Sequence, residues 1–220
     1  MTARAVLCVD GPSGSGKGTL ARRLAAELGF AYLDSGAIYR ALGLRVQRQG
    51  LADAQAAQAA AGMELRFGTQ DNEVWMGDEP IASQIRTEEA GAAASRLGAR
   101  PEVREALLQW QRDFAAPRPL VADGRDMGTV VFPHAPCKIF LEASAQVRAQ
   151  RRHAELLDAG KSANFDQIYR DICARDERDR NRAVAPLRPA EDALVIDSSA
   201  LSIDQVVDAA RQHWQACQGR

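Results

Sequence analysis

The residues best suited to chemistry form a glycine-rich segment, Gly11-Pro-Ser-Gly-Ser-Gly-Lys17-Gly-Thr19. Its G-x-x-x-x-G-K spacing is that of a phosphate-binding loop, in which glycines let consecutive backbone N–H groups turn toward phosphate oxygens. A chance glycine-rich turn is the alternative. This segment, however, also follows a short apolar run and opens a helical pattern, whose N-terminus adds partial positive charge. We therefore predict an ATP site of nine consecutive residues: Gly11, Pro12, Ser13, Gly14, Ser15, Gly16, Lys17, Gly18 and Thr19.

One position departs from the usual motif. Ser or Thr normally follows the lysine, but here Gly18 does, and Thr19 comes one place later. The hydroxyl that commonly holds Mg²⁺ is therefore displaced. We expect Mg²⁺ as the cofactor, bound mainly through ATP and water, and we predict no protein residue as its direct ligand. The form G-K-G-T is typical of nucleoside monophosphate kinases.

Two further segments offer groups for a second, anionic substrate. Ser35 and Arg40 follow an apolar run that ends at Leu33, at the sheet edge where open α/β folds bind ligands. They lie about a turn and a half apart on a helix, so a bend at the helix start could direct both at one anion. A capped helix with a solvated arginine is the structural alternative.

The second of these segments contains both acidic and basic residues, and a purely structural role explains it less well. Asp123, Arg125 and Asp126 stand together in a glycine-bounded turn after another apolar run. Asp123 has the place of the strand-end carboxylate that organises Mg²⁺ and its waters in phosphate-transferring enzymes. Arg125 could grip a phosphate, and Asp126 could accept a hydrogen bond from an exocyclic amine.

The stretch from Arg175 to Arg182 contains four arginines. On a helix, Arg175, Arg178, Asp179 and Arg182 share one face by their spacing of three and four residues. Such runs are commonly solvated faces with internal ion pairs. Beside a phosphate loop the arginines gain a second use, because ATP and a monophosphate together carry several negative charges that guanidinium groups bind in bidentate fashion.

The apolar pattern predicts the elements that position these residues. Strands are expected at 5–10, 30–33, 119–122, 138–141 and 194–196, and helices at 17–28, 34–49, 88–97, 101–115, 144–159, 164–180 and 203–215. Strands alternating with helices predict an α/β fold with a five-stranded parallel sheet flanked by helices. Residues 52–61 are alanine-rich and helical, whereas 64–67, 73–76 and a segment near Ile81 alternate as short strands around a turn at 68–72. They predict a small antiparallel insertion.

Composition limits the remaining classes of function. The chain has 220 residues, of which 46% are hydrophobic, and 28 basic against 29 acidic side chains give a net charge of −1. This excludes a disordered chain and argues against a dedicated nucleic-acid binder. The first apolar run is too short for a membrane span or a secretion signal, so we expect a cytoplasmic protein. The sequence spacing of Cys8, Cys137, Cys173 and Cys217 and of the three histidines predicts neither a zinc site nor a disulfide framework.

Across its length the sequence resembles the bacterial cytidylate kinase family of P-loop nucleoside monophosphate kinases. The matching stretches are Gly11–Leu20, Leu33–Arg40, Ile85–Glu89, Val103–Leu107, Ala122–Pro133, Arg175–Pro186 and Asp197–Ser199. The runs A-D-G-R-D-M-G-T-V-V-F-P and R-D-R-N-R-A-V-A-P are the most specific of these. The resemblance implies transfer of the γ-phosphoryl group of ATP to CMP or dCMP by a monomer.

The resemblance also implies the parts and the site. It implies one kinase domain with a core at about 1–34, 100–145 and 183–220, a monophosphate-binding insertion at about 35–99 and a short helical lid at about 146–182. The catalytic residues would be Lys17, Asp123 and Arg125, and Arg151 and Arg152 would belong to the lid. The monophosphate would be bound by Ser35, Arg40, Ser95, Arg104, Arg125, Asp126, Arg175, Asp179 and Arg182.

The chemistry of cytosine is consistent with that site. Asp126 could accept from the N4 amine and Arg104 could donate toward N3 or O2, whereas uracil would place an oxygen against the carboxylate. This predicts a preference for CMP over UMP. Two alternatives remain: a kinase with another acceptor, such as UMP, AMP or shikimate, and a non-catalytic module that binds ATP to recruit a partner. A panel of acceptors with ATP and Mg²⁺ distinguishes them.

Overall fold

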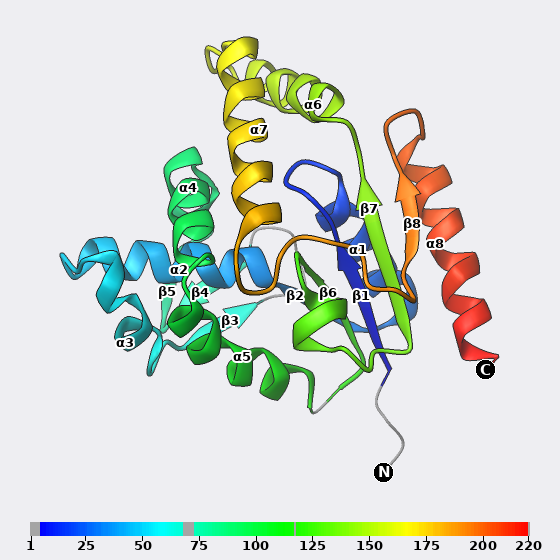
Figure 1. Ribbon diagram of the computed structural model, residues 1–220, viewed down its shortest axis with the longest axis horizontal. Coiled ribbons are helices and arrows are strands. Elements are labelled where there is room, and N and C mark those ends of the chain that lie inside the picture. Colours follow the sequence, from blue (N-terminus) through cyan, green and yellow to red (C-terminus); the bar gives the residue numbers. More distant parts are fainter. Residues whose placement is uncertain (1–4, 68–72, 117, 220) are drawn as a thin grey trace.

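A parallel five-stranded sheet forms the centre of the molecule in the computed structural model, which describes residues 5–67, 73–116 and 118–219. Its strands are β1 (Val6–Asp10), β2 (Ala31–Asp34), β6 (Leu120–Gly124), β7 (Cys137–Glu142) and β8 (Leu194–Asp197), in the order β2-β6-β1-β7-β8 (Figure 1). The predicted fold class and all five strands are confirmed within two residues at each end.

Helices cover both faces of this sheet, which is why its strands are apolar on both sides. On one face α1 (Lys17–Leu28) and α8 (Ile203–Gln218) pack against Leu7 and Val9 of β1. On the other face Cys8 points into a second core with α2 (Ser35–Arg48) and α5 (Pro101–Ala115). The polar and glycine-rich segments that follow the strands are therefore left at the carboxyl edge of the sheet.

The chain between β2 and β6 forms the predicted insertion. It contains η1 (Asp53–Gln55), α3 (Ala56–Ala60), η2 (Gln84–Arg86), α4 (Glu88–Leu97) and an antiparallel sheet of β3 (Leu65–Phe67), β4 (Val74–Met76) and β5 (Glu79–Pro80). The third strand precedes Ile81, whose side chain is fully buried in the core. The turn expected at 68–72 lies outside the described residues.

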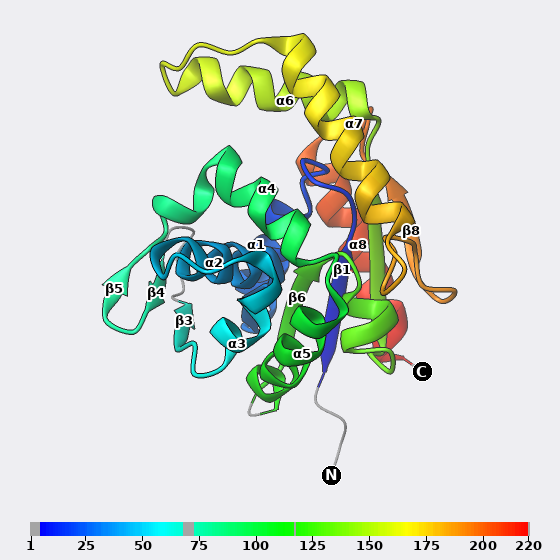
Figure 2. The same cartoon turned by 60° about the vertical axis from the view of Figure 1, so that its left-hand side comes forward.

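The two arginine-rich helices, α6 (Ala145–Asp158) and α7 (Phe165–Asn181), form a hairpin that projects from the carboxyl edge of the sheet (Figures 1 and 2). The C-terminal end of α7 lies beside α4, next to the carboxyl edge of the sheet. No helix in the described part of the chain is long and apolar enough to cross a membrane.

Two features were not predicted. Residues Met127–Val131 form a single π-helical turn, η3, whose first two N–H groups donate to the Asp10 carboxylate at 2.8 Å each. In addition, α8 carries two residues that lie beside the start of β7, so that Cys137, His213 and Cys217 form a cluster despite their distance in sequence. The sequence spacing, which predicted neither a zinc site nor a disulfide framework, gave no sign that these three side chains lie together.

Candidate active site

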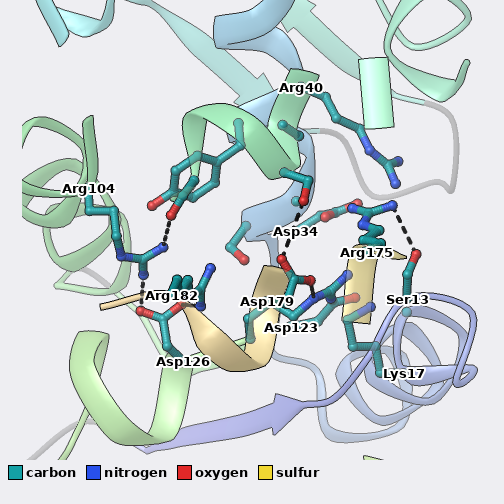
Figure 3. A pocket seen from close by; sticks show the side chains of 18 residues that line it. Ser13, Lys17, Asp34, Arg40, Arg104, Asp123, Asp126, Arg175, Asp179 and Arg182 are labelled. Atoms are coloured by element: carbon teal, nitrogen blue, oxygen red, sulfur yellow. Dashed lines mark hydrogen bonds and ion pairs between the residues drawn. The ribbon is translucent and has the colours of Figure 1, made fainter. Parts of the chain in front are cut away.

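One pocket collects every residue predicted for the second substrate and all three predicted catalytic residues (Figure 3). It lies at the carboxyl edge of the sheet, between the phosphate loop, α2, α4, α5, the end of β6 and α7. Its lining residues are Ser13, Lys17, Gly18, Asp34, Ser35, Gly36, Tyr39, Arg40, Ala94, Ser95, Gly98, Arg104, Asp123, Arg125, Asp126, Arg175, Asp179 and Arg182. Residues up to 169 positions apart in sequence thus enclose a single charged cavity (Ser13 to Arg182).

The phosphate loop has the backbone that its glycines permit. Gly14 and Gly16 adopt φ values of 77° and 91°, in the left-handed region that favours glycine. At Gly11 a side chain has no room, because a Cβ atom would lie 2.2 Å from the carbonyl oxygen of Leu141. The loop therefore folds tightly over the end of β7 and presents the N-terminus of α1 to the pocket.

Gly18 explains the departure from the usual motif. A Cβ atom at this position would lie 3.2 Å from Oδ2 of Asp123 and within reach of the Arg22 guanidinium. The space that Ser or Thr normally occupies is thus taken by the carboxylate at the end of β6. Asp123 is held there by a hydrogen bond from the Tyr32 hydroxyl at 2.9 Å.

Lys17 and Asp123 affect each other's ionisation. Burial, reinforced by the nearby Arg125, lowers the pKa of Lys17 to about 8, although Asp123 acts against this shift. Burial likewise raises the pKa of Asp123, opposed by Lys17. Asp34 stands opposite Asp123 on the neighbouring strand, and both line the pocket. Two carboxylates at the phosphate loop give the hard oxygen donors that suit Mg²⁺ and its bound waters.

The opposite end of the pocket, toward α5, is built around Asp126. This carboxylate is 3% exposed and forms an ion pair with Arg104, while Nη2 of Arg182 lies 3.7 Å from its other oxygen. Arg104 also donates to the carbonyl of Gly98 at 3.1 Å, and its guanidinium lies over the Tyr39 ring, 5.7 Å from the centroid. A donor and an acceptor are thus held side by side next to an aromatic face.

Between the two ends, α7 contributes Asp179. Nε of Arg125 donates to its carboxylate at 2.9 Å, and Ser95 lies 3.5 Å away on α4. Arg125 lowers the pKa of Asp179, although burial opposes this. Arg175, on the same helix, donates to the Ser13 hydroxyl at 3.1 Å, and burial and Arg125 lower its pKa to about 10.

The cations in this pocket outnumber the anions that pair with them. Arg40, Arg175 and Lys17 surround one space (Figure 3). Arg125 lines the same pocket and helps burial to lower the pKa values of both Lys17 and Arg175. Buried nitrogen atoms of Arg40, Arg175 and Arg182 have no hydrogen-bond partner among the described residues. Buried donors of this kind require partners, and phosphate oxygens would supply them.

Three supporting residues escaped the sequence analysis. Arg148 is 1% exposed and binds both oxygens of Asp176, with Nη1 at 3.0 Å, and the same group donates to the carbonyl of Ser13 at 2.9 Å. Asp10 is also buried, which raises its pKa to about 7. Helical spacing could have shown that Arg148 shares a face with Arg151 and Arg152, but nothing local marks it as the buried member.

The two arginines predicted for the lid do not line the pocket. Arg151 donates to the Ser198 carbonyl at 2.7 Å and so ties α6 to the segment after β8. Arg152 pairs with Glu88 at the start of α4 and with Glu155 on its own helix. Of the arginines on α6, Arg148 is the one that contacts the phosphate loop.

Comparisons with known proteins agree with this geometry. The profile of the family described as "Cytidylate kinase" matches residues 7–216. A cytidylate kinase of Pasteurella multocida (strain Pm70) is 51% identical over 220 residues, covering 98% of this chain and 97% of its own. A cytidylate kinase of Vibrio cholerae is 53% identical over 217 residues, covering 96% of each chain. Among solved structures, an uncharacterized protein from Eubacterium ventriosum has the same fold, with a TM-score of 0.54 at 12% identity, covering 97% of this chain and 99% of its own.

Proposed function

The chain belongs to the cytidylate kinase family, and from that premise we propose how its pocket transfers the γ-phosphoryl group of ATP to CMP or dCMP, giving ADP and CDP or dCDP. One observation carries the proposal. The pocket joins a phosphate loop at one end to the Arg104–Asp126 pair at the other, with free guanidinium nitrogens between them. A donor triphosphate and an acceptor nucleotide can therefore meet in line above the sheet edge.

At the donor end, residues 11–19 would wrap the phosphates of ATP. Backbone N–H groups of the loop and the N-terminus of α1 face the anion, and Lys17 lines the pocket from the first turn of that helix. As charge moves between the β- and γ-phosphates during transfer, Lys17 and Arg125 would neutralise it. The remaining loop residues contribute backbone shape rather than side-chain chemistry.

Asp123, together with Asp34, would hold Mg²⁺ through its water ligands. When bound, Mg²⁺ neutralises phosphate charge and orients the phosphates. The chain's own contribution is to keep Asp123 fixed, through the Tyr32 hydroxyl, and close to Lys17.

At the acceptor end, Arg40 and Arg125 would grip the monophosphate beside Ser35. Asp179 would accept from the sugar hydroxyls, with Arg175 beside it, and Asp126 would accept from cytosine N4 while Arg104 donates to the ring. Ser95 and Arg182 complete this surface. A general base is unnecessary, because the attacking monophosphate oxygen is already ionised near neutral pH.

We assign three working parts to the chain on the same basis. The core at about 1–34, 100–145 and 183–220 holds the sheet, the segment at about 35–99 holds the acceptor, and the hairpin at about 146–182 is the lid. The support for a lid is that α7 places Arg175 and Asp179 over the pocket while most of α6 projects away from it. Closure would exclude water from the transferred group. We also propose that the protein acts as a monomer and that it does so in the cytoplasm.

A panel of acceptors tests the proposal. With ATP and Mg²⁺, release of ADP should follow CMP and dCMP, and should be much weaker with UMP, AMP, GMP and shikimate. Turnover with another acceptor would show that the Asp126 end does not recognise cytosine. Tight ATP binding without turnover on any acceptor would instead favour a nucleotide-dependent recruiting module. Lys17→Ala is the matched inactive control, since it removes the lysine that lines the donor end of the pocket and keeps the glycines of the loop.

A further inference from the structure

A cluster of soft metal-ligating side chains lies outside the kinase pocket, between the start of β7 and the last turns of α8. Cys137 is the first residue of β7 and is fully buried. His213 and Cys217 lie four residues apart on one face of α8 and are partly exposed. Figure 1 shows β7, β8 and α8 packed along this side of the molecule. One ligand atom from each of the three residues lies within 4.8 Å of the others.

The spacing of these atoms suits a tetrahedral thiophilic ion. Zn²⁺ binds cysteine sulfur at about 2.3 Å and histidine nitrogen at about 2.0–2.1 Å, so two such ligands at a tetrahedral angle stand about 3.6 Å apart. The Sγ atom of Cys217 lies 3.7 Å from Nε2 of His213. Two sulfurs and one imidazole are also a donor set that soft and borderline cations prefer over Mg²⁺.

We propose that Cys137, His213 and Cys217 form a binding site for a thiophilic divalent cation such as zinc, separate from the magnesium that accompanies ATP. Three protein ligands leave the fourth position to water, and the partly exposed His213 and Cys217 give the ion a path from solvent. The ion would tie the end of α8 to the sheet. Because Cys137 begins β7 while the pocket lies at the carboxyl ends of the strands, this site is distant from phosphoryl transfer.

The test uses the full chain, reduced and freed of metal, titrated with zinc by calorimetry and with cobalt by absorption spectroscopy. The expected result is one ion per chain, a thiolate-to-cobalt charge-transfer band and a higher melting temperature with zinc. Cys217→Ser and His213→Gln should each weaken binding at least tenfold and abolish the rise in melting temperature. Their kinase activity should stay normal, which shows that the variants fold. Cys137 is left intact because it is fully buried.

Cys173→Ser and His153→Gln serve as matched controls, because these residues lie on the hairpin away from the cluster. Both should bind zinc as the parent chain does. The proposal is overturned if the parent chain binds no ion, or if Cys217→Ser and His213→Gln bind as tightly as it does. Formation of a Cys137–Cys217 disulfide with oxidised glutathione, which is reduced to two glutathione thiols, would also overturn it if the reduced chain binds no ion, since the cluster would then be a redox pair.

Discussion

Asp126 is the residue on which we expect discrimination between bases to depend. It is a buried carboxylate with Arg104 on one oxygen and Arg182 near the other. A carboxylate at this position accepts from cytosine N4 but repels uracil O4. The two arginines would contribute to specificity indirectly, by holding this carboxylate in position.

Asp126→Asn should reduce kcat/KM for CMP more than for UMP, because an amide can donate to uracil O4. A good pair of this kind discriminates by about 1–3 kcal/mol, so the CMP-to-UMP ratio should narrow by about 5- to 150-fold. Steady-state kinetics with both acceptors measures the ratio. Asp78→Asn, on an exposed turn of the insertion, is the control. An unchanged ratio would move Asp126 from base recognition to a purely structural role.

We expect ATP binding to depend on pH through Lys17. Its pKa is lowered to about 8 by burial and by Arg125, so above pH 8 most of the ligand-free protein has a neutral lysine. Bound phosphates raise this pKa again, and ATP binding should therefore take up a proton. The uptake should grow from pH 7.5 to 9 toward about one proton per chain. Calorimetry in buffers of different ionisation enthalpy measures it, and uptake that is absent or falls with pH would contradict the assignment.

At the scale of the elements, the Arg148–Asp176 pair joins three parts. It connects α6 to α7, and through the Ser13 carbonyl it connects both helices to the phosphate loop. Movement of the hairpin, as proposed for the lid, would therefore shift the phosphate loop. The pair also explains why a stretch so rich in charge stays ordered as two packed helices.

Arg148→Ala should destabilise the protein by about 3–5 kcal/mol, because Asp176 would remain buried without its partner. It should also weaken ATP binding. Replacing both partners, as Arg148→Met with Asp176→Leu, should restore much of the stability but not the contact with Ser13. Urea unfolding and ATP titration separate the two effects, with Arg170→Ala on the exposed face of α7 as control. Equal stability of the single and the double variant would argue against a penalty from an unpaired buried charge.

The bounds of the elements that depend on local sequence pattern were predicted well. The bounds of α1, α4 and α5 coincide with the sequence expectation, because each has an apolar stripe with a clear start or stop residue. The π-helical turn at Met127–Val131 was missed, since it depends on the carboxylate of Asp10, 117 residues away. The partners of Arg151 and Arg152, which are Ser198 and Glu88, were not predicted for a similar reason, because tertiary packing sets them.

At the scale of the whole molecule, family resemblance and structure agree on where the site residues converge. Parallel strands bring their carboxyl ends to one edge, so Asp34 and Asp123 had to become neighbours once β2 paired with β6. Local pattern contained no comparable information about Cys137, His213 and Cys217. That cluster depends on how α8 packs against the outer part of the sheet.

The strand order also has a consequence for synthesis on the ribosome. The central strand β1 emerges early, but both of its neighbours, β6 and β7, follow residue 119, and β2 also waits for β6. A nascent chain that reaches only α5 therefore carries two apolar strands with open edges, which are prone to aggregation. In chains arrested before β6, a protease should cleave within β1. In chains that have β7 outside the exit tunnel, β1 should be protected from cleavage. Proteolysis of stalled complexes checks this order, and protection of β1 before β6 emerges would contradict it.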